Sequence, residues 1–514
     1  MATVTYAAAL PDYKWIPDYF GPNDSSLITA RTATKITWTN PDGSKVELAG
    51  TGLAYDGGEP ISGTITTIRV RDSGGTLLYT ITGLKQDAQN LYFVAFGYER
   101  DDGRRENGDG FNFLSTVLNE SDVFNGSNES EEIGGARGGG NDIINAGGGN
   151  DYIHGGAGNT TIDGGADWDT VTYDESFYDF AAFRGVAANL NTGAVTDCWG
   201  GKDTLSSIEE VIGSKFADRL TGNDLDNALS GLRGNDILIG GDGNGYDEVL
   251  YHRDARFGGS RGINADLVAG TIRDGFGNTD TVSGFERVIG TGFNDKFKGD
   301  GGNNHFQGQA GKDSYDGGLG EDRVIFRFWE NQSQGATVNL ALATNQVLND
   351  GFGNVEKLVS IEQLEGTDLA DNFTGNAANN FFMGRDGNDI LNGGGGSDEL
   401  QGGRGSDQMT GGAGGDVFSY WGDNGTAAFG DTITDFKTGT DRIAFHVPDF
   451  NGMDATVRFN VGASAGGAGS WFFFNANTKG LFWDADGTGA GAAVRVATLT
   501  GVTTMVATDI ELWT

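Results

Sequence analysis

A nine-residue period constrains what this chain can fold into more than any other feature of its sequence. Between Gly384 and Tyr420, one aspartate, one glycine and one large apolar residue each recur at every ninth position. The aspartates are Asp389, Asp398, Asp407 and Asp416, the glycines two positions earlier are Gly387, Gly396, Gly405 and Gly414, and the apolar residues two positions later are Leu391, Leu400, Met409 and Phe418. A helix is excluded, because each glycine costs a helix about 1 kcal/mol relative to alanine. The period predicts a short strand followed by a glycine turn.

The same period occupies four blocks of the chain. The position of the aspartate is filled by Asp142, Asp151, Thr160 and Asp169 in the first block, Asp218, Asn227 and Asp236 in the second, Asp295, Asn304, Asp313 and Asp322 in the third, and Asp371, Asn380, Asp389, Asp398, Asp407 and Asp416 in the fourth. Most of the substitutions are asparagine, which keeps a side-chain oxygen and so suits an oxygen ligand better than a catalytic acid. We therefore predict that these aspartates and asparagines, with Gly387, Gly396, Gly405 and Gly414, form metal sites.

A longer period divides the middle of the chain into three related modules. The stretches "SIEEVIGSKFADRLTGN", "GFERVIGTGFNDKFKGD" and "SIEQLEGTDLADNFTGN" begin at Ser207, Gly284 and Ser360. A related, strand-rich stretch lies upstream of each, beginning with "ANLNTGAVTDCWGGKDTL" in the first module. The expected domains are an N-terminal β domain over residues 1–125, a first repeat block over 126–172, three tandem modules over 173–428 and a C-terminal cap over 429–514.

Two nine-residue units, one for each wall, would complete one coil of a parallel β-solenoid. Residues 18 positions apart would then lie above one another, with Asp389 over Asp371 and Asp407 over Asp389. Stacked carboxylates repel, and a hard divalent cation between them would turn that repulsion into a cross-link. Calcium fits better than magnesium, because it accepts about 6 to 8 oxygen ligands, including main-chain carbonyls. The stacked pairs predict about six to nine Ca²⁺ ions.

The repeat resembles the nonapeptide GGxGxDxUx of the RTX (repeats-in-toxin) family, in which U is a large apolar residue. The fullest matches are "GGGGSDELQ" from Gly393, "GGRGSDQMT" from Gly402 and "GGAGGDVFS" from Gly411. The resemblance implies an all-β, parallel β-roll (β-solenoid) with an N-terminal β domain and a C-terminal β cap. It also implies secretion through a type I system, with folding on external calcium. The stretches from Gly430 and Gly480 resemble the C-terminal region of serralysin-type RTX exoproteins, which caps the roll and carries the export signal.

The composition agrees with an extracellular protein that does not bind nucleic acid. The net charge of -38 repels nucleic acid and anionic membranes. Cys198 is the single cysteine, so an intrachain disulfide cannot form. The N-terminus does not resemble a Sec-type signal peptide, and no stretch approaches the roughly 18 consecutive apolar residues of a membrane span. The expected partners are the secretion machinery, other copies of this chain or a cell-surface polysaccharide.

The sequence predicts no catalytic residue. None of the four histidines belongs to an HExxH motif, and the two G-x-S-x-G strings, at Ser260 and Ser464, are expected by chance in a chain with 89 glycines. We expect a structural or adhesive role, such as a surface layer, matrix or cell-contact protein. An RTX exoenzyme acting on polysaccharide, or a hydrolase, stays open as the alternative.

The N-terminal region alternates polar and apolar residues in the manner of antiparallel strands. The residues "DSGG" from Asp72 predict a hairpin turn between two such strands. An aromatic cluster over residues 13–20 is expected to form the core of this domain or a partner contact. We expect this domain to serve in attachment or assembly.

Overall fold

The computed structural model is all-β and falls into two compact units. It describes residues 3–6, 27–32, 35–39, 45–56, 59–71, 77–87, 121–128, 130–134, 140–174, 182–241, 243, 245–328, 332–420 and 430–514. Within these residues the chain forms strands and short 3-10 turns but no α-helix. The first unit holds residues 1–250 and 278–285, and the second holds residues 251–277 and 286–514. This confirms the predicted all-β class, whereas the four-part division by residue number stays a prediction.

The first unit begins with an antiparallel sheet. Its strands are β2 (Leu27–Thr32), β3 (Lys35–Thr39), β4 (Lys45–Asp56), β5 (Glu59–Arg71) and β6 (Leu77–Asp87). Val46 and Leu48 alternate with more exposed positions and are completely buried, as a period of two requires. Ile65 and Ile68 are also completely buried, and a shift of register between Ile65 and Thr67 lets both reach the core although they are three positions apart. Strands β5 and β6 pair as the predicted hairpin requires, although its turn residues and the aromatic cluster at 13–20 lie outside the described residues. Strand β1 (Thr3–Tyr6) joins this sheet to β7 (Val123–Asn125), pairing antiparallel with β6 and parallel with β7.

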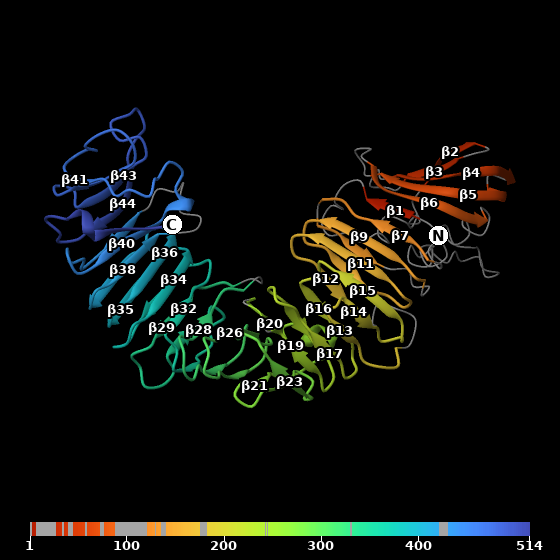
Figure 1. Ribbon diagram of the computed structural model, residues 1–514, viewed down its shortest axis with the longest axis horizontal. Helices are drawn as coiled ribbons and strands as arrows, with labels where there is room; N and C mark the ends of the chain where they lie inside the picture. Colours follow the sequence, from red (N-terminus) through yellow and green to blue (C-terminus); the bar gives the residue numbers. More distant parts are fainter. Residues whose placement is uncertain are drawn as a thin grey trace. The chain divides into compact units, whose positions relative to one another are not determined.

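The nine-residue units form alternate walls of a parallel roll, as is plainest in the second unit (Figure 1). One wall contains β33 (Asn372–Thr374), β35 (Ile390–Gly395) and β37 (Gln408–Ala413), and the other contains β34 (Phe381–Asp386), β36 (Glu399–Arg404) and β38 (Val417–Tyr420). Asn372 pairs with Ile390, and Ile390 with Gln408, so one coil takes 18 residues. The predicted two-unit coil is thus confirmed.

The large apolar residue of each unit fills the space between the walls. Phe373, Leu391 and Met409 from one wall and Phe382, Leu400 and Phe418 from the other all have no exposed surface. Each strand is too short to bury more than one or two side chains, so stacking of coils is what builds a continuous core.

The first unit repeats this coil. Its strands after β7 are β8 (Glu132–Gly134), β9 (Ile143–Gly148), β10 (Tyr152–His154), β11 (Thr161–Ala166), β12 (Thr170–Thr172), β16 (Glu210–Ile212), β17 (Arg219–Thr221), β18 (Ala228–Ser230), β19 (Ile237–Ile239), β20 (Glu248–Leu250) and β23 (Thr279–Ser283). Ile144 pairs with Ile162 in one wall and Ile153 with Val171 in the other, and all four are completely buried.

The stretch upstream of each module is an insertion into one wall of the roll. In the first module β13 (Ala187–Asn189), β14 (Ala194–Thr196) and β15 (Lys202–Ser206) form an antiparallel meander. Strand β15 pairs in parallel with β11, and β13 pairs in parallel with β17. The opposite wall continues directly from β12 to β16. The module therefore adds two strands to one wall without interrupting the roll.

The second unit contains the corresponding strands of the other modules. They are β21 (Asn264–Asp266), β22 (Thr271–Arg273), β24 (Arg287–Ile289), β25 (Lys296–Lys298), β26 (His305–Gln307), β27 (Ser314–Asp316), β28 (Arg323–Ile325), β29 (Thr337–Asn339), β30 (Val347–Asn349), β31 (Lys357–Val359) and β32 (Gln363–Glu365). In the third module β29 and β30 are antiparallel, β31 pairs with β27 and β29 pairs with β33, which repeats the arrangement of the first module.

The C-terminal strands continue both walls and then cover the end of the roll. Strand β39 (Asp431–Ile433) pairs with β37 and β44 (Val494–Leu499), and β40 (Arg442–His446) pairs with β38 and β45 (Ile510–Trp513). Strands β41 (Phe459–Val461), β42 (Trp471–Asn475) and β43 (Gly480–Asp484) complete the sheet that contains β44. Phe445 lies 4.7 Å from Phe472, ring centre to ring centre, in an aromatic cluster that closes the core. This is the predicted C-terminal β cap.

Replacing Gly405 with alanine tests the glycine turn. Gly405 has a φ of +152°, and a Cβ there would lie 1.5 Å from the carbonyl oxygen of Gly387, one coil earlier. We expect Gly405→Ala to lower the free energy of unfolding by about 2 to 3 kcal/mol, because two stacked turns must separate. Urea unfolding in saturating calcium measures this loss.

Gly415→Ala is the matched control in the same block. A Cβ at Gly415 would meet nothing closer than the carbonyl oxygen of Thr440 at 3.2 Å. We expect this substitution to change stability by less than about 1 kcal/mol. Equal losses for the two variants would contradict the close stacking of the turns.

Candidate metal centre

The repeated aspartates form continuous columns inside the roll. Oδ1 of each carboxylate accepts a hydrogen bond from the main-chain N–H of the matching residue one coil earlier. The N–H of Asp371 lies 2.8 Å from Oδ1 of Asp389, and the N–H of Asp389 lies 2.8 Å from Oδ1 of Asp407. The N–H of Asp398 lies 3.0 Å from Oδ1 of Asp416. The structure thus places residues 18 positions apart in direct contact.

Each column continues through acids that the nine-residue period did not reveal. Asp203 accepts from the N–H of Thr160 across 43 positions of sequence, and Glu362 accepts from Asp322 across 40. The other acids of this kind are Glu209, Asp247, Asp280, Glu356, Asp431 and Asp441. Period counting missed these acids because inserted strands before Asp203 and longer loops before Asp247, Asp431 and Asp441 break the 18-residue spacing. A local sequence pattern could have found these acids, because each of them stands two positions before a buried apolar residue, as the repeat aspartates do.

Asparagines next to the column hold the coils together in the opposite direction. Oδ1 of Asn379 accepts the N–H of Ser397 at 2.7 Å, and Oδ1 of Asn388 accepts the N–H of Ser406 at 2.8 Å. The residue after Asn388 is Asp389, which belongs to the column and accepts the N–H of Asp371 from the coil before. An Asn–Asp pair therefore links one coil to both of its neighbours, a role that the sequence analysis did not assign.

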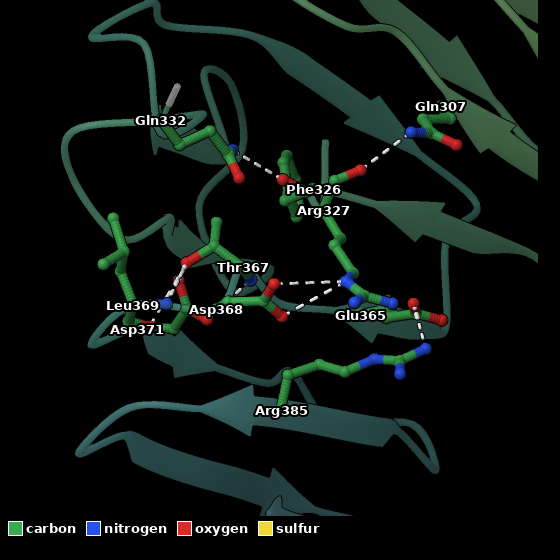
Figure 2. A network of polar contacts seen from close by, with 10 residues as sticks. All are labelled: Gln307, Phe326, Arg327, Gln332, Glu365, Thr367, Asp368, Leu369, Asp371 and Arg385. Carbon is green, nitrogen blue, oxygen red and sulfur yellow. Dashed lines mark hydrogen bonds and ion pairs between the residues drawn. The ribbon is translucent and has the colours of Figure 1, made fainter. Parts of the chain in front are cut away.

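The first aspartate of each module has protein donors on both of its oxygens. Figure 2 shows Thr367 facing Asp371, with its N–H 2.8 Å from Oδ2 and its hydroxyl 3.0 Å from Oδ1. Ala336 donates a further N–H to Oδ1 of Asp371 at 2.5 Å. Ser214 and Thr291 serve Asp218 and Asp295 in the same manner. A cation that binds any of these three carboxylates would have to displace protein donors from it.

The asparagines at the aspartate position accept hydrogen bonds from their own turns. Oδ1 of Asn227, Asn304 and Asn380 accepts the main-chain N–H four residues earlier, at 2.6, 2.9 and 2.9 Å. Their side chains therefore close their own turns.

A second group of aspartates keeps one buried oxygen without a hydrogen-bond donor. Oδ2 is unpartnered in Asp151, Asp169, Asp322, Asp389, Asp398, Asp407 and Asp416. The last four occupy consecutive units beside the cap. A buried, unpaired carboxylate oxygen is unfavourable unless a proton or a cation satisfies it.

The remaining predicted aspartates, Asp142, Asp236 and Asp313, belong to neither of these two groups. Asp142 and Asp236 each accept a main-chain N–H at 2.8 Å on Oδ1. Asp313 accepts one at 2.7 Å on Oδ1, and the Tyr315 hydroxyl lies 3.4 Å from its Oδ2.

The donor set around the unpaired oxygens suits a hard cation that also uses main-chain carbonyls. Within the described residues, no group of three or more His, Cys, Asp or Glu side chains has the geometry to hold a metal ion by itself. Main-chain carbonyls lie near the unpaired oxygens, since a Cβ at Gly384 would lie 2.1 Å from Oδ2 of Asp389 and 2.5 Å from the carbonyl oxygen of Gly402 in the next coil. Carboxylate and carbonyl oxygens are the ligands that calcium prefers.

Burial raises the pKa of the unpaired carboxyls. The pKa of Asp389 is raised to about 8 by burial and by neighbouring carboxylates, against the lowering effect of the N–H of Asp371. Burial raises the pKa of Asp151 to about 7 and that of Asp398 to about 6. Protons and cations therefore compete for the same oxygens.

A comparison with family models identifies the repeats. The model described as the RTX calcium-binding nonapeptide repeat (4 copies) matches residues 138–162, 212–246, 289–324, 365–400 and 392–427. The chain therefore contains RTX calcium-binding nonapeptide repeats. RTX nonapeptide repeats bind calcium, and the matched segments include every predicted ligand except Asp169.

Two solved structures resemble parts of this RTX-repeat chain. The AlgE6R3 subunit of the Azotobacter vinelandii mannuronan C5-epimerase is 26% identical over 28% of this chain and 78% of its own, with a TM-score of 0.20. The extracellular lipase LipA from Serratia marcescens is 11% identical over 95% of this chain and 85% of its own, with a TM-score of 0.13. No curated protein matched the chain.

The two groups of aspartates should respond differently to substitution. We expect Asp398→Ala to raise the calcium concentration at the folding midpoint severalfold, because Oδ2 of Asp398 has no protein donor. Asp371→Ala should lower stability by about 1 to 3 kcal/mol with little change in the number of bound ions, because Thr367 and Ala336 satisfy its oxygens. Calcium titrations followed by circular dichroism, with ion counting at saturation, separate the effects. Equal loss of bound calcium in both variants would contradict this division.

In the calcium-free chain, stability should fall as the pH rises from about 4 to about 8. A carboxyl whose pKa is higher in the folded chain binds its proton more tightly when folded. The stability that the protonated carboxyl contributes is therefore fully present below its pKa in the unfolded chain, 3.8. For Asp389 this stability is lost by about pH 8. We expect a higher urea midpoint in EDTA at about pH 5.5 than at about pH 8, and a smaller difference in saturating calcium. A midpoint in EDTA that rises with pH would show that these oxygens are not buried and unpaired.

Proposed function

We propose that the chain is a secreted structural protein whose roll folds and assembles when it meets external calcium. The observation that carries this proposal is the run of buried carboxylate oxygens without donors in the last repeat block. At -38 the chain also has a large net charge to offset, and each bound Ca²⁺ removes two negative charges. Calcium would thus act as the cross-link between coils that the protein itself does not supply.

We propose that the strongest sites use Asp389, Asp398, Asp407 and Asp416. Each would bind through Oδ2 and share its ion with glycine carbonyls, such as that of Gly402 near Oδ2 of Asp389. The turn glycines Gly387, Gly396, Gly405 and Gly414 remain predicted ligands, although Gly387, Gly405 and Gly414 lie nearer to Oδ1 of the aspartates. Asp151, Asp169 and Asp322 would do the same in the other blocks. The bonded oxygens of Asp218, Asp295 and Asp371 favour a structural role for these three. The number of ions, six to nine, stays a prediction.

The proposal that the protein is secreted rests on its RTX repeats and not on the geometry of the metal sites. RTX-repeat proteins are typically secreted by type I systems, and among the described residues we find no helix with the length and hydrophobicity to cross a membrane. We propose export through an uncleaved signal within residues 429–514. Attachment to a cell surface or its polysaccharide belongs to the same proposal.

A structural role is favoured over hydrolysis by the surroundings of the two candidate serines. Ser260 lies between a 3-10 turn (Asp254–Phe257) and β21, and Ser464 lies in irregular chain after β41. A nucleophile on a G-x-S-x-G motif needs a strand before it and a helix after it. No α-helix follows either serine within 245–328 or 430–514.

One surface groove keeps an enzyme or polysaccharide-binding function as the second candidate. It lies in the second unit, has a volume of about 260 Å³ and is lined by Glu321, Glu362, Phe381, Asp398 and Glu399, among others. The Arg323 guanidinium lies 5.2 Å from the centre of the Phe381 ring at this surface. An aromatic face beside several carboxylates suits a neutral sugar chain and would repel an anionic one.

Calcium should promote both folding and reversible assembly of the full chain. We expect the β signal in circular dichroism to appear with calcium at about 10⁻⁴ to 10⁻³ M, and light scattering to grow in the same range. The scattering should reverse with EDTA. A fully formed β signal in EDTA would contradict calcium-dependent folding.

A chain that begins at residue 126 is the control for assembly, because it keeps the repeats and lacks the proposed contact domain. It should fold with calcium and scatter less than the full chain. If the full chain folds but stays monomeric at millimolar calcium, the structural role fails, and the groove at Phe381 becomes the leading candidate site.

A further inference from the structure

A row of outward-facing residues crosses five neighbouring strands of the second unit and contains three cations but no acid. The strands lie in the order β22, β21, β25, β27 and β31, and their register places five residues side by side, which are Arg273, Asn264, Lys296, Ser314 and Lys357. Ser314 is half-buried, and the other four are exposed. Such a row stands out in a chain that has 72 acidic residues and only 34 basic ones.

The next row along the same strands is neutralised by its own residues. Its members are Thr271, Asp266, Lys298, Asp316 and Val359. Nζ of Lys298 lies 3.0 Å from Oδ2 of Asp266. By contrast, no carboxylate in the described part of the chain forms an ion pair with the three cations of the first row. Those three charges are therefore available to a ligand.

Arg261 brings a second guanidinium beside that of Arg273. A Cβ at Gly277 would lie 3.0 Å from Nη1 of Arg261 and 3.5 Å from Nη2 of Arg273, so both side chains reach the same point of the loop after β22. The loop itself offers Arg273 one acceptor, the Gly277 carbonyl, at 3.4 Å from Nε. Guanidinium groups have donors only and cannot bond to each other. A bound anion would stabilise both charges at this point.

The third module has a neutral version of the same contact. Its stretches "QGATVNL" from Gln334 and "NDGFGN" from Asn349 correspond to "RGINADL" from Arg261 and "RDGFGN" from Arg273 in the second module. Nδ2 of Asn349 donates a hydrogen bond to Oε1 of Gln334 at 3.2 Å. The third module thus closes this place with its own amides, whereas the second module has two like charges there.

The spacing of the row suits an extended polymer with few charges. Arg273 and Lys296 are two strands apart, as are Lys296 and Lys357, so neighbouring cations lie about 10 Å apart, twice the strand spacing and close to the length of a disaccharide. Duplex DNA carries a charge about every 1.7 Å and would be repelled by the net charge of -38. An extended peptide repeats the side chains of one face about every 7 Å. Asn264 and Ser314, between the cations, can bond to sugar hydroxyls.

We propose that Arg261, Arg273, Lys296 and Lys357 bind a linear polysaccharide whose sugars carry carboxylates, laid across the strands from β22 to β31. The two arginines hold one carboxylate through their N–H groups, and the lysines hold carboxylates further along the polymer. This gives a surface to the polysaccharide attachment within the proposed function, although it rests on the row and not on calcium binding. The groove at Phe381 is a separate surface, whose acids suit a neutral sugar chain.

Calorimetric titration of the full chain in saturating calcium tests the proposal, with fragments of hyaluronan as the probe because this linear polymer has one carboxylate per disaccharide. We expect Arg273→Gln and Lys296→Gln each to weaken binding about 3- to 10-fold, since each removes a charged donor. Lys298→Gln is the matched control, because it removes the same charge from the same strand but from the row that Asp266 neutralises. It should weaken binding less than about twofold. Hyaluronan with its carboxyl groups reduced should not bind.

Circular dichroism of the same samples separates this proposal from the proposed function. The substituted side chains are exposed, so the variants should keep the calcium midpoint of the unaltered chain. If the chain folds with calcium but the row variants bind hyaluronan as Lys298→Gln does, this proposal is wrong and the proposed function stands. If polyglutamate binds through these residues and hyaluronan does not, the row is a protein contact and the proposal is also wrong. Binding of hyaluronan through the row by a chain that folds without calcium would support this proposal and contradict the proposed function.

Discussion

The hydrogen bond from a main-chain N–H to a carboxylate one coil later is the interaction on which this structure depends. It places an acidic side chain inside the roll at nearly every step, where desolvation disfavours charge. One N–H satisfies one oxygen and leaves the other to be satisfied by a hydroxyl, a proton or a metal ion. The tight glycine turns follow from the same requirement, because the coils must stack closely enough for the bond to form.

That second oxygen separates structural acids from candidate calcium ligands. Asp371 has a threonine four residues earlier that donates to both of its oxygens, whereas Asp389 has none and keeps Oδ2 unpaired. The unpaired oxygens are concentrated in the last block, whose columns pass directly into the cap through Asp431 and Asp441. We therefore expect the need for calcium to be greatest in the coils that join the roll to its cap.

The sequence predicted the periodic part of the molecule well, because a strict period encodes a local contact that repeats. The 18-residue coil, the buried column of Leu391 and its equivalents, and the stacking of Asp389 on Asp371 all follow from counting positions. The meanders could not be predicted in this way, since β15 pairs with β11 across an insertion whose length no period records. The columns through Asp203 and Glu362 were missed for the same reason. The division of the aspartates required knowledge of their donors, although the Ser or Thr four positions earlier in "GSKFAD", "GTGFND" and "GTDLAD" is a usable signal.

The most direct test of the central claim is to locate calcium in crystals of the calcium-loaded protein by its anomalous scattering. The account predicts ions beside Oδ2 of Asp389, Asp398, Asp407 and Asp416, shared with carbonyls of the adjoining glycine turns. It predicts no ion in contact with the carboxylates of Asp218 and Asp295, whose oxygens already accept protein hydrogen bonds. Ions bound equally to both groups of aspartates, or none beside the last block, would contradict the claim that unpaired carboxylate oxygens decide where calcium binds.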